Sequence, residues 1–133
     1  MNTVINFEIA KLLKEKGFER NVGYSKPYYN HLGELNGDVT EYIRAQIHDE
    51  DTTPFETTPA PTIAEVVMWL HKEKGLWVNV MYMGFELKYS WSIDIITTSG
   101  SNWDSYGEEG DICYKSPTEA YEAAILYTLN NLI

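Results

Sequence analysis

The stretch TIAEVVMWLHKEKGLWVNVMYMGFELKYSWSIDI, residues 62–95, decides the fold of this chain. At its start, Thr62 stands three positions before Glu65, the spacing at which a hydroxyl and a carboxylate satisfy backbone N–H groups of the first helical turn. Apolar side chains then follow at helical spacing. We therefore predict a helix over residues 63–74, whose buried face is formed by Ile63, Val66, Val67 and Leu70.

The second half of the same stretch has the pattern of strands. One strand is predicted from Leu76 to Met83, and every odd position from Phe85 to Ile95 is apolar. Most even positions between them are polar, so one face of this strand is dry and the other is wet. Such alternation is typical of an antiparallel sheet that helices cover on one side.

Downstream, the sequence predicts a loop rich in Gly, Ser and acidic residues over 99–111, a short strand over 112–115 and a closing helix capped by Ser116. Ser116 and Glu119 repeat the capping spacing, and Pro117 suits the first helical position. The predicted fold class is α+β, an antiparallel sheet of about three to four strands with helices packed on one face. The core has the order helix, strand, strand, strand, helix.

The closing helix has more apolar side chains than one face can bury. We expect the following residues to face the sheet: Tyr121, Ala124, Ile125, Thr128, Leu129 and Leu132. Leu126, Tyr127 and Ile133 are apolar but lie outside this face. On the earlier helix, Met68 and Trp69 are likewise apolar residues outside the buried face. We expect these apolar side chains to pack against one another, either within one subunit or across the interface of a two-fold homodimer.

The pattern is weaker upstream of residue 62. A first helix is predicted over 4–16, ended by Gly17, after which Phe18 folds back on the last turn. Residues 18–37 predict irregular structure or a weak hairpin with a tight turn at Asn36-Gly37. Residues 38–47 fit either a helix or a strand, with a helix preferred, and 49–61 read as an extended connection. The expected organisation is one domain over 1–133, made of an N-terminal helix (1–18), a variable loop-rich segment (19–61) and the core (62–133).

Length and composition restrict the class of protein. A chain of 133 residues can bury a core without disulfides, and the single Cys113 cannot form an intrachain bridge. No apolar run reaches the length of a membrane span, so a cytoplasmic location is expected. The net charge of −10 is concentrated in segments 38–56 and 99–111. These acidic segments disfavour nucleic acid and anionic membranes as partners, and they allow a basic protein.

No motif identifies a catalytic, cofactor or metal site. The three histidines lack metal-ligand spacing, and Gly107 to Gly110 places two glutamates where a phosphate would have to bind. Cys113 is expected to be a small core residue. Aromatic residues within acidic loops are plausible anchors for a protein partner. The candidate partner-binding residues are Trp103, Tyr106, Glu108, Glu109, Asp49, Glu50 and Asp51.

Three segments carry a resemblance to a known family: INFEIAKLLKEKGF (5–18), APTIAEVVMWL (60–70) and SPTEAYEAAI (116–125). The chain resembles a family of small acidic proteins of uncharacterised function that phages and mobile elements of gut bacteria encode. The resemblance implies an accessory role in such an element. The matching positions are helix caps, helix ends and core residues, so the resemblance implies a fold and transfers no catalytic residue.

The leading hypothesis is a non-enzymatic protein that binds another protein through its acidic loops or its apolar closing helix. In a sharper version, the acidic segments imitate nucleic-acid charge and occupy the basic site of a DNA-binding protein. One alternative is an RNA-binding module, because the order helix, three strands, helix is similar to that of the double-stranded-RNA-binding domain. However, Glu119 and Glu122 replace the lysines with which that family's last helix contacts phosphates. A small enzyme with a site assembled from distant residues is the other alternative.

Overall fold

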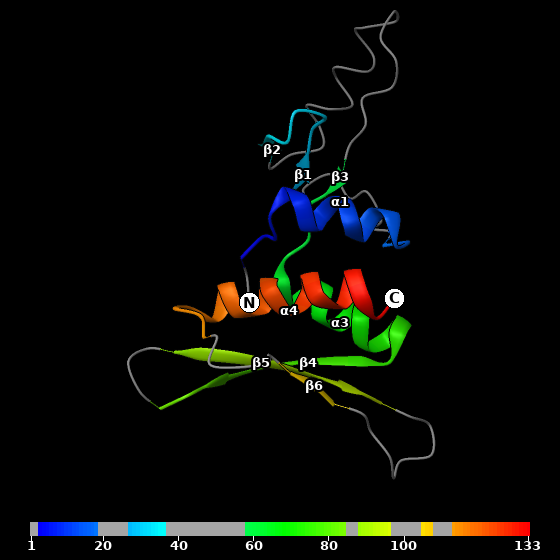
Figure 1. The fold of residues 1–133 in the computed structure, drawn as a ribbon. Coiled ribbons are helices and arrows are strands. Elements are labelled where there is room, and N and C mark those ends of the chain that lie inside the picture. The colour runs from blue at the N-terminus through cyan, green and yellow to red at the C-terminus, as the bar shows by residue number, and fades with distance from the viewer. Residues whose placement is uncertain (1–2, 19–26, 37–57, 85–87, 97–104, 108–112) are drawn as a thin grey trace, which may run out of the picture. The chain divides into compact units, whose positions relative to one another are not determined.

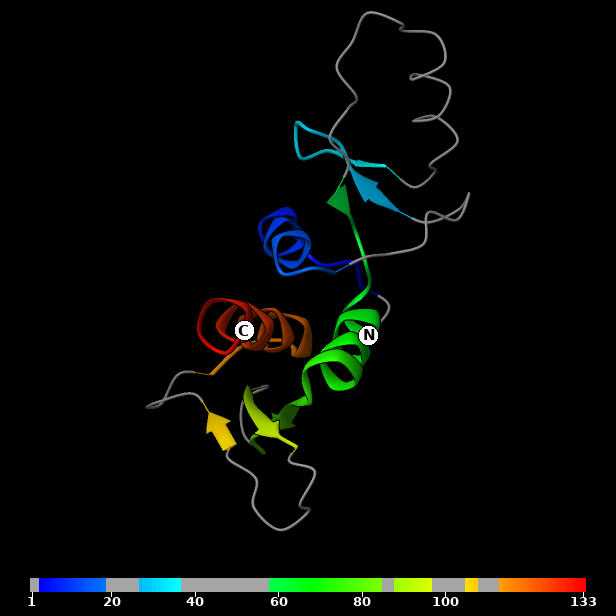
Figure 2. The same ribbon diagram turned by 90° about the vertical axis from the view of Figure 1, so that its right-hand side faces the viewer.

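The computed structural model describes residues 3–18, 27–36, 58–84, 88–96, 105–107 and 113–133. The chain forms two compact units, residues 4–61 and residues 1–3 with 62–133. The described residues form helices and antiparallel sheets, which confirms the mixed α+β class (Figures 1 and 2).

In the unit of residues 62–133, helix α3 (Ile63–Lys74) begins and ends as predicted. The Thr62 hydroxyl accepts a hydrogen bond from the Glu65 backbone N–H at 3.2 Å, and Gly75 ends the helix in a left-handed conformation with φ of 66°. A glycine adopts this conformation without the steric cost of a Cβ. The four residues expected on the buried face are the four that are buried, Ile63, Val66, Val67 and Leu70.

Three antiparallel strands form the sheet of this unit, in the spatial order β4 (Leu76–Tyr82), β5 (Tyr89–Ile95) and β6 (Ser105–Gly107). In β5 the odd positions Trp91 and Ile93 are buried and their even neighbours are half-buried, as the alternation predicted. Val80 of β4 lies opposite Trp91. The predicted strand residues 85–87 lie outside the described residues.

Two predictions about the segments that pair with β5 on the side opposite β4 were wrong. Strand β6 lies within the predicted loop 99–111, and residues 113–115 form a single bridge, Tyr114 to Tyr89, instead of a strand. The backbone of β6 pairs with Ser92, Ile93 and Asp94 of β5. Backbone pairing depends little on side-chain type, so a Ser- and Gly-rich segment can complete a sheet although its composition is that of a loop.

Helix α4 (Pro117–Asn131) begins at its predicted cap and covers β4 and β5 (Figure 1). The Ser116 hydroxyl accepts from the Glu119 N–H at 3.2 Å, and the Glu119 carboxylate accepts from the Lys115 N–H at 3.2 Å. Of the residues expected to face the sheet, Tyr121 and Leu132 are half-buried. The buried residues are Ala120, Ala124, Ile125, Thr128 and Leu129. The Thr128 hydroxyl donates to the Ala124 carbonyl, which satisfies it inside the core.

In the unit of residues 4–61, helix α1 (Phe7–Glu15) begins three residues later than predicted. Asn6 caps it by accepting from the Ile9 N–H at 2.9 Å, and Ile5 pairs with the Pro61 carbonyl instead of joining the helix. At its end Gly17 has φ of 92°, and the Phe18 N–H donates to the Leu13 carbonyl at 2.9 Å. The expected glycine stop and the folding back of the buried Phe18 are confirmed.

A second antiparallel sheet packs beside α1, in the order β2 (Leu35–Asn36), β1 (Tyr28–Tyr29) and β3 (Thr58–Pro59). A hairpin does form within residues 18–37, but the turn predicted at Asn36-Gly37 was wrong. Asn36 pairs with Tyr28 inside the ladder, and residues 30–34 connect the two strands. The prediction of an extended connection over 49–61 was wrong at its end, where Thr58 of β3 pairs with Tyr29 in the sheet. Residues 38–47 lie outside the described ranges. Among the described helices, none has the length and apolar character needed to cross a membrane.

Candidate functional site

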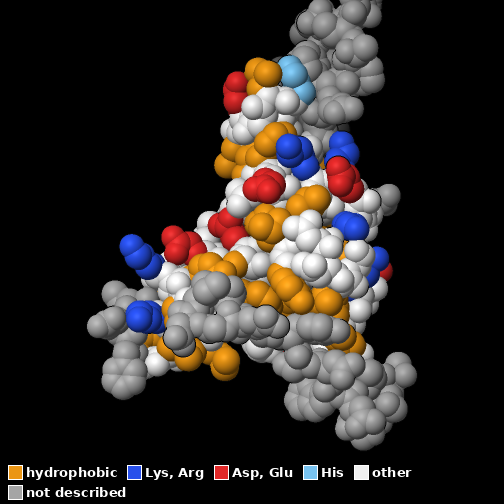
Figure 3. Space-filling view, in the orientation of Figure 1, with side chains coloured by type: hydrophobic (Ala, Val, Ile, Leu, Met, Phe, Trp, Pro, Cys, Tyr) orange, Lys and Arg blue, Asp and Glu red, His pale blue; other side chains and the backbone are white. Residues whose placement is uncertain are grey.

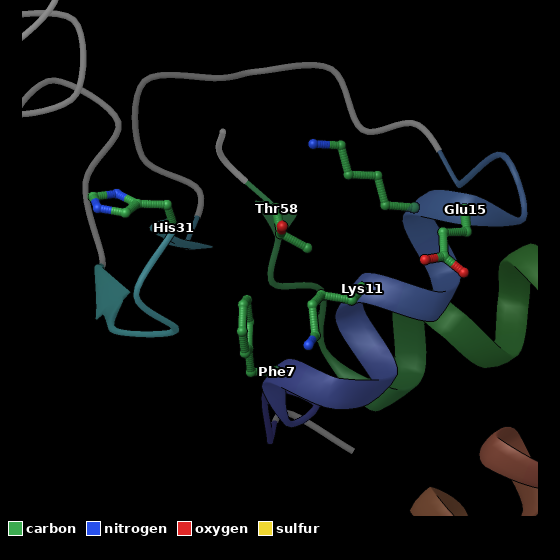
Figure 4. Close-up of a pocket in the computed structure, with 6 residues that line it drawn as sticks. Phe7, Lys11, Glu15, His31 and Thr58 are labelled. Carbon is green, nitrogen blue, oxygen red and sulfur yellow. The ribbon is translucent and has the colours of Figure 1, made fainter. Parts of the chain in front are cut away.

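A pocket of about 530 Å³, open to solvent, lies against α1 in the unit of residues 4–61 (Figure 4). Residues from α1, from the turn between β1 and β2, and from β3 line it: Phe7, Lys11, Lys14, Glu15, His31 and Thr58. On the face of the molecule shown in Figure 3, the described acidic and basic side chains are interspersed with apolar ones. The residues that line the pocket supply the apolar Phe7 ring, the Lys11 and Lys14 ammonium groups and the Glu15 carboxylate.

The α1 side of the pocket follows from helical spacing. Phe7, Lys11, Lys14 and Glu15 recur at intervals of four, three and one residue, which places them on one side of the helix. The Lys11 ammonium lies 4.7 Å from the centre of the Phe7 ring, a cation–π contact that holds both side chains in place.

The Phe7 ring is also held from the sheet side. It packs on the Tyr29 ring with centroids 5.2 Å apart and an angle of 55° between the planes. A Cβ built on Gly33 would lie 2.9 Å from Phe7 Cδ1, so the backbone of the turn contacts the ring directly. Lys11, Tyr29 and Gly33 together fix the orientation of this aromatic surface.

The opposite rim consists of His31 and Thr58. The turn that carries His31 is organised by Asn30, whose side-chain oxygen accepts from the Leu32 and Glu34 N–H groups at 3.0 and 2.9 Å. Thr58 is buried, whereas His31 is exposed. The pocket thus offers ammonium, imidazole and hydroxyl groups around a fixed ring, a combination that can hold an apolar group next to a carboxylate.

Of the residues predicted to bind a partner, the structure describes only Tyr106. Tyr106 lies in β6, where its backbone pairs with Ile93. The other six, Trp103, Glu108, Glu109, Asp49, Glu50 and Asp51, lie outside the described residues. Among the tryptophans in the described helices and strands, Trp91 is buried, and Trp69 and Trp77 are half-buried. Cys113 is also half-buried and unbridged, so it is not the core residue that was expected.

Within the described part of the chain, no three His, Cys, Asp or Glu side chains lie close enough to hold a metal ion. Among the described residues that line the pocket, Glu15 supplies a carboxylate and His31 an imidazole.

Sequence reasoning did not identify this pocket. The spacing of Phe7 and Lys11 on one helix was visible and could have suggested an aromatic–cation pair. The rim residues His31 and Thr58 are brought to α1 by the pairing of β1 with β2 and β3, which no sequence motif indicated.

Comparisons of the chain with protein-family models, with curated proteins and with solved structures gave no significant match.

Proposed function

We propose that this chain is a non-enzymatic protein that acts by binding another protein, and that the pocket beside α1 receives part of that partner. The observation that carries the proposal is the Phe7 ring, fixed by Tyr29 and Gly33 and open to solvent beside the Lys11 ammonium. Fixed aromatic surfaces next to charged donors are typical anchor points of protein interfaces.

The lining defines the chemistry of the partner segment. An aromatic or aliphatic side chain would pack on Phe7, and a neighbouring carboxylate would pair with Lys11 or Lys14. Leu32 and Leu35, on the hairpin that carries His31, are 68% and 53% exposed and give this hairpin an apolar surface of its own. We therefore expect a partner segment that is apolar and acidic.

The acidic segments 38–56 and 99–111 provide a second proposed contact, with a basic protein that otherwise binds nucleic acid. The support for this contact is the concentration of the net charge of −10 in those two segments. An accessory role in a phage or mobile element remains a proposal that rests on the sequence resemblance.

A pull-down from bacterial lysate at low and high salt tests both contacts. The variant Lys11→Glu/Lys14→Glu reverses the charge of the pocket, and Lys72→Glu on the exposed side of α3 is the matched control. A partner lost with the pocket variant but kept with the control supports the pocket. A basic partner that is lost at high salt, yet kept with the pocket variant, supports the acidic segments. Circular dichroism should be the same for all three proteins.

RNA binding is the second candidate. The order α3, β4, β5, β6, α4 favours it, because the double-stranded-RNA-binding domain has that order of elements. Against it, the first turns of α4 carry Glu119 and Glu122 where phosphate-binding lysines would be needed. RNA recovered in the same pull-down, and released by high salt, would overturn the protein-binding proposal in favour of this candidate.

A further inference from the structure

Strand β4 lies at one edge of its sheet and carries no charge. The sheet order is β4-β5-β6, so one side of β4 has no neighbouring strand among the described residues (Figure 2). From Gly75 to Gly84 the chain has no acidic or basic residue and no proline, although its net charge is −10. Edge strands of stable monomers are normally protected by charges, proline or a bulge. β4 has none of these protections.

The register identifies the backbone groups that face the open edge. Ile96 N–H donates to Gly75 O, and Met83 N–H donates to Lys88 O, both at 2.8 Å. In an antiparallel ladder the inward-bonded residues alternate, so odd positions of β4 bond to β5 and even positions point outward. The outward groups belong to Leu76, Val78, Val80 and Tyr82. Within the described structure, no hydrogen bond reaches them from outside the sheet.

We propose that this edge pairs with β4 of a second copy of the chain, antiparallel and with the two-fold axis at Asn79. The outward positions then face one another: Leu76 lies opposite the partner's Tyr82, and Val78 lies opposite the partner's Val80. Each such pair exchanges two backbone hydrogen bonds. The interface uses the same surface on both copies, so it closes at a dimer.

Side chains also match in this register. On the sheet face away from the helices, Trp77 lies opposite the partner's Met81, and methionine sulfur packs well against aromatic rings. Met81 and Tyr82 are 51% and 57% exposed in one subunit, so pairing covers apolar surface that is otherwise in water. At the axis, Asn79 faces the partner's Asn79, and its amide already donates to its own Asp94 at 2.8 Å.

The lack of charge on β4 allows a second copy to approach this edge. Two copies that each carry −10 repel one another, and the acidic residues are concentrated in segments 38–56 and 99–111. The uncharged stretch from Gly75 to Gly84 is where they can approach without placing like charges opposite each other. A symmetric β4 pair therefore satisfies the open backbone groups without placing like charges opposite each other in the paired segment.

The register makes a sharp prediction for cross-linking. Asn79 would form a non-hydrogen-bonded pair with its equivalent, and Cα atoms of such pairs lie about 4.5 Å apart, within the range of a disulfide. In a Cys113→Ser background, Asn79→Cys should form an intersubunit disulfide in air. Met83→Cys is the control, because the two copies of residue 83 would lie about 27 Å apart. Cross-linking at 83 and not at 79 would overturn the register.

Light scattering across micromolar concentrations tests the association itself. The parent should approach twice its 15.3 kDa mass. Met81→Lys, inside the paired segment, should weaken the dimer by about tenfold or more, and Met83→Lys, outside it, should have little effect. Val80→Pro removes an outward N–H and should also give a monomer, with an unchanged far-ultraviolet spectrum as proof of folding. A parent that stays monomeric, or a dimer that Met81→Lys and Val80→Pro leave intact, would overturn the proposal.

Discussion

Trp91 of β5 and Tyr127 of α4 pack against each other, with ring centroids 5.1 Å apart and an angle of 42° between the ring planes. Trp91 is only 5% exposed. Its indole N–H has no acceptor among the described residues, so its contribution to stability comes from apolar burial and ring contact. The pair thereby links the strand register to the position of the closing helix.

Truncation of the Trp91 side chain should lower the stability of the protein. We expect Trp91→Ala to lower the free energy of unfolding by about 3–5 kcal/mol, because it removes a buried ring and leaves a cavity. Ser92→Ala, on the opposite face of the same strand, should change it by about 0.5 kcal/mol or less. Urea denaturation measures both. Equal effects of the two substitutions would mean that the faces of β5 are reversed.

The cap of α4 gives a second prediction. Ser116→Ala removes the acceptor of the Glu119 N–H and should lower the free energy of unfolding by about 0.5–2 kcal/mol. Ser116→Asp keeps an acceptor and places a negative charge at the helix N-terminus, so it should be nearly neutral. Thermal denaturation compares the two variants. Equal damage from both would show that the hydroxyl has a different role.

Local signals explain which parts of the fold could be predicted. Both ends of α3, the N-terminus of α4 and the end of α1 are set by hydroxyl caps and glycines that contact residues at most five positions away. Such contacts can be inferred from spacing alone. The burial of Trp91 and Ile93 was likewise predictable, because strand alternation places them on one face.

Other elements depend on partners far along the chain. β3 exists because Thr58 pairs with Tyr29, and β6 because Tyr106 pairs with Ile93. Neither segment has the alternation of a strand, so their pairing is decided by open backbone groups on a neighbour. The candidate pocket was missed for the same reason, since its rim is assembled by the strand pairing of the smaller sheet.

The pocket gives a test of its geometry in Gly33. Gly33 and Gly17 both have positive φ, 80° and 92°, so an alanine at either position should cost about 1–2 kcal/mol of backbone strain. Only at Gly33 would the new methyl group also approach a side chain, Phe7, to 2.9 Å. Gly33→Ala should therefore be more destabilising than Gly17→Ala, and it should weaken partner binding. Equal melting temperatures would contradict the contact between the turn and the ring.

A buried hydrogen bond joins the small sheet to the segment before α1. The Tyr29 hydroxyl donates to the Ile5 carbonyl at 2.5 Å. Tyr29→Phe leaves this carbonyl without that donor and should lower the free energy of unfolding by about 1–3 kcal/mol. The control is Tyr82→Phe, whose side chain is 57% exposed and which should be neutral. A neutral Tyr29→Phe variant would indicate that water replaces the hydroxyl.

The last prediction separates two surfaces through which a dimer could form. The sequence suggested the apolar surplus of α4, but Tyr127 packs on Trp91 within the subunit, and Leu126 is half-buried. If association occurs through the open edge of β4, Leu126→Lys should leave the dimer intact, whereas Met81→Lys should weaken it. Sedimentation velocity at several concentrations measures both dissociation constants. Loss of the dimer with Leu126→Lys, while Met81→Lys has no effect, would assign the interface to α4 and leave the β4 edge unpaired.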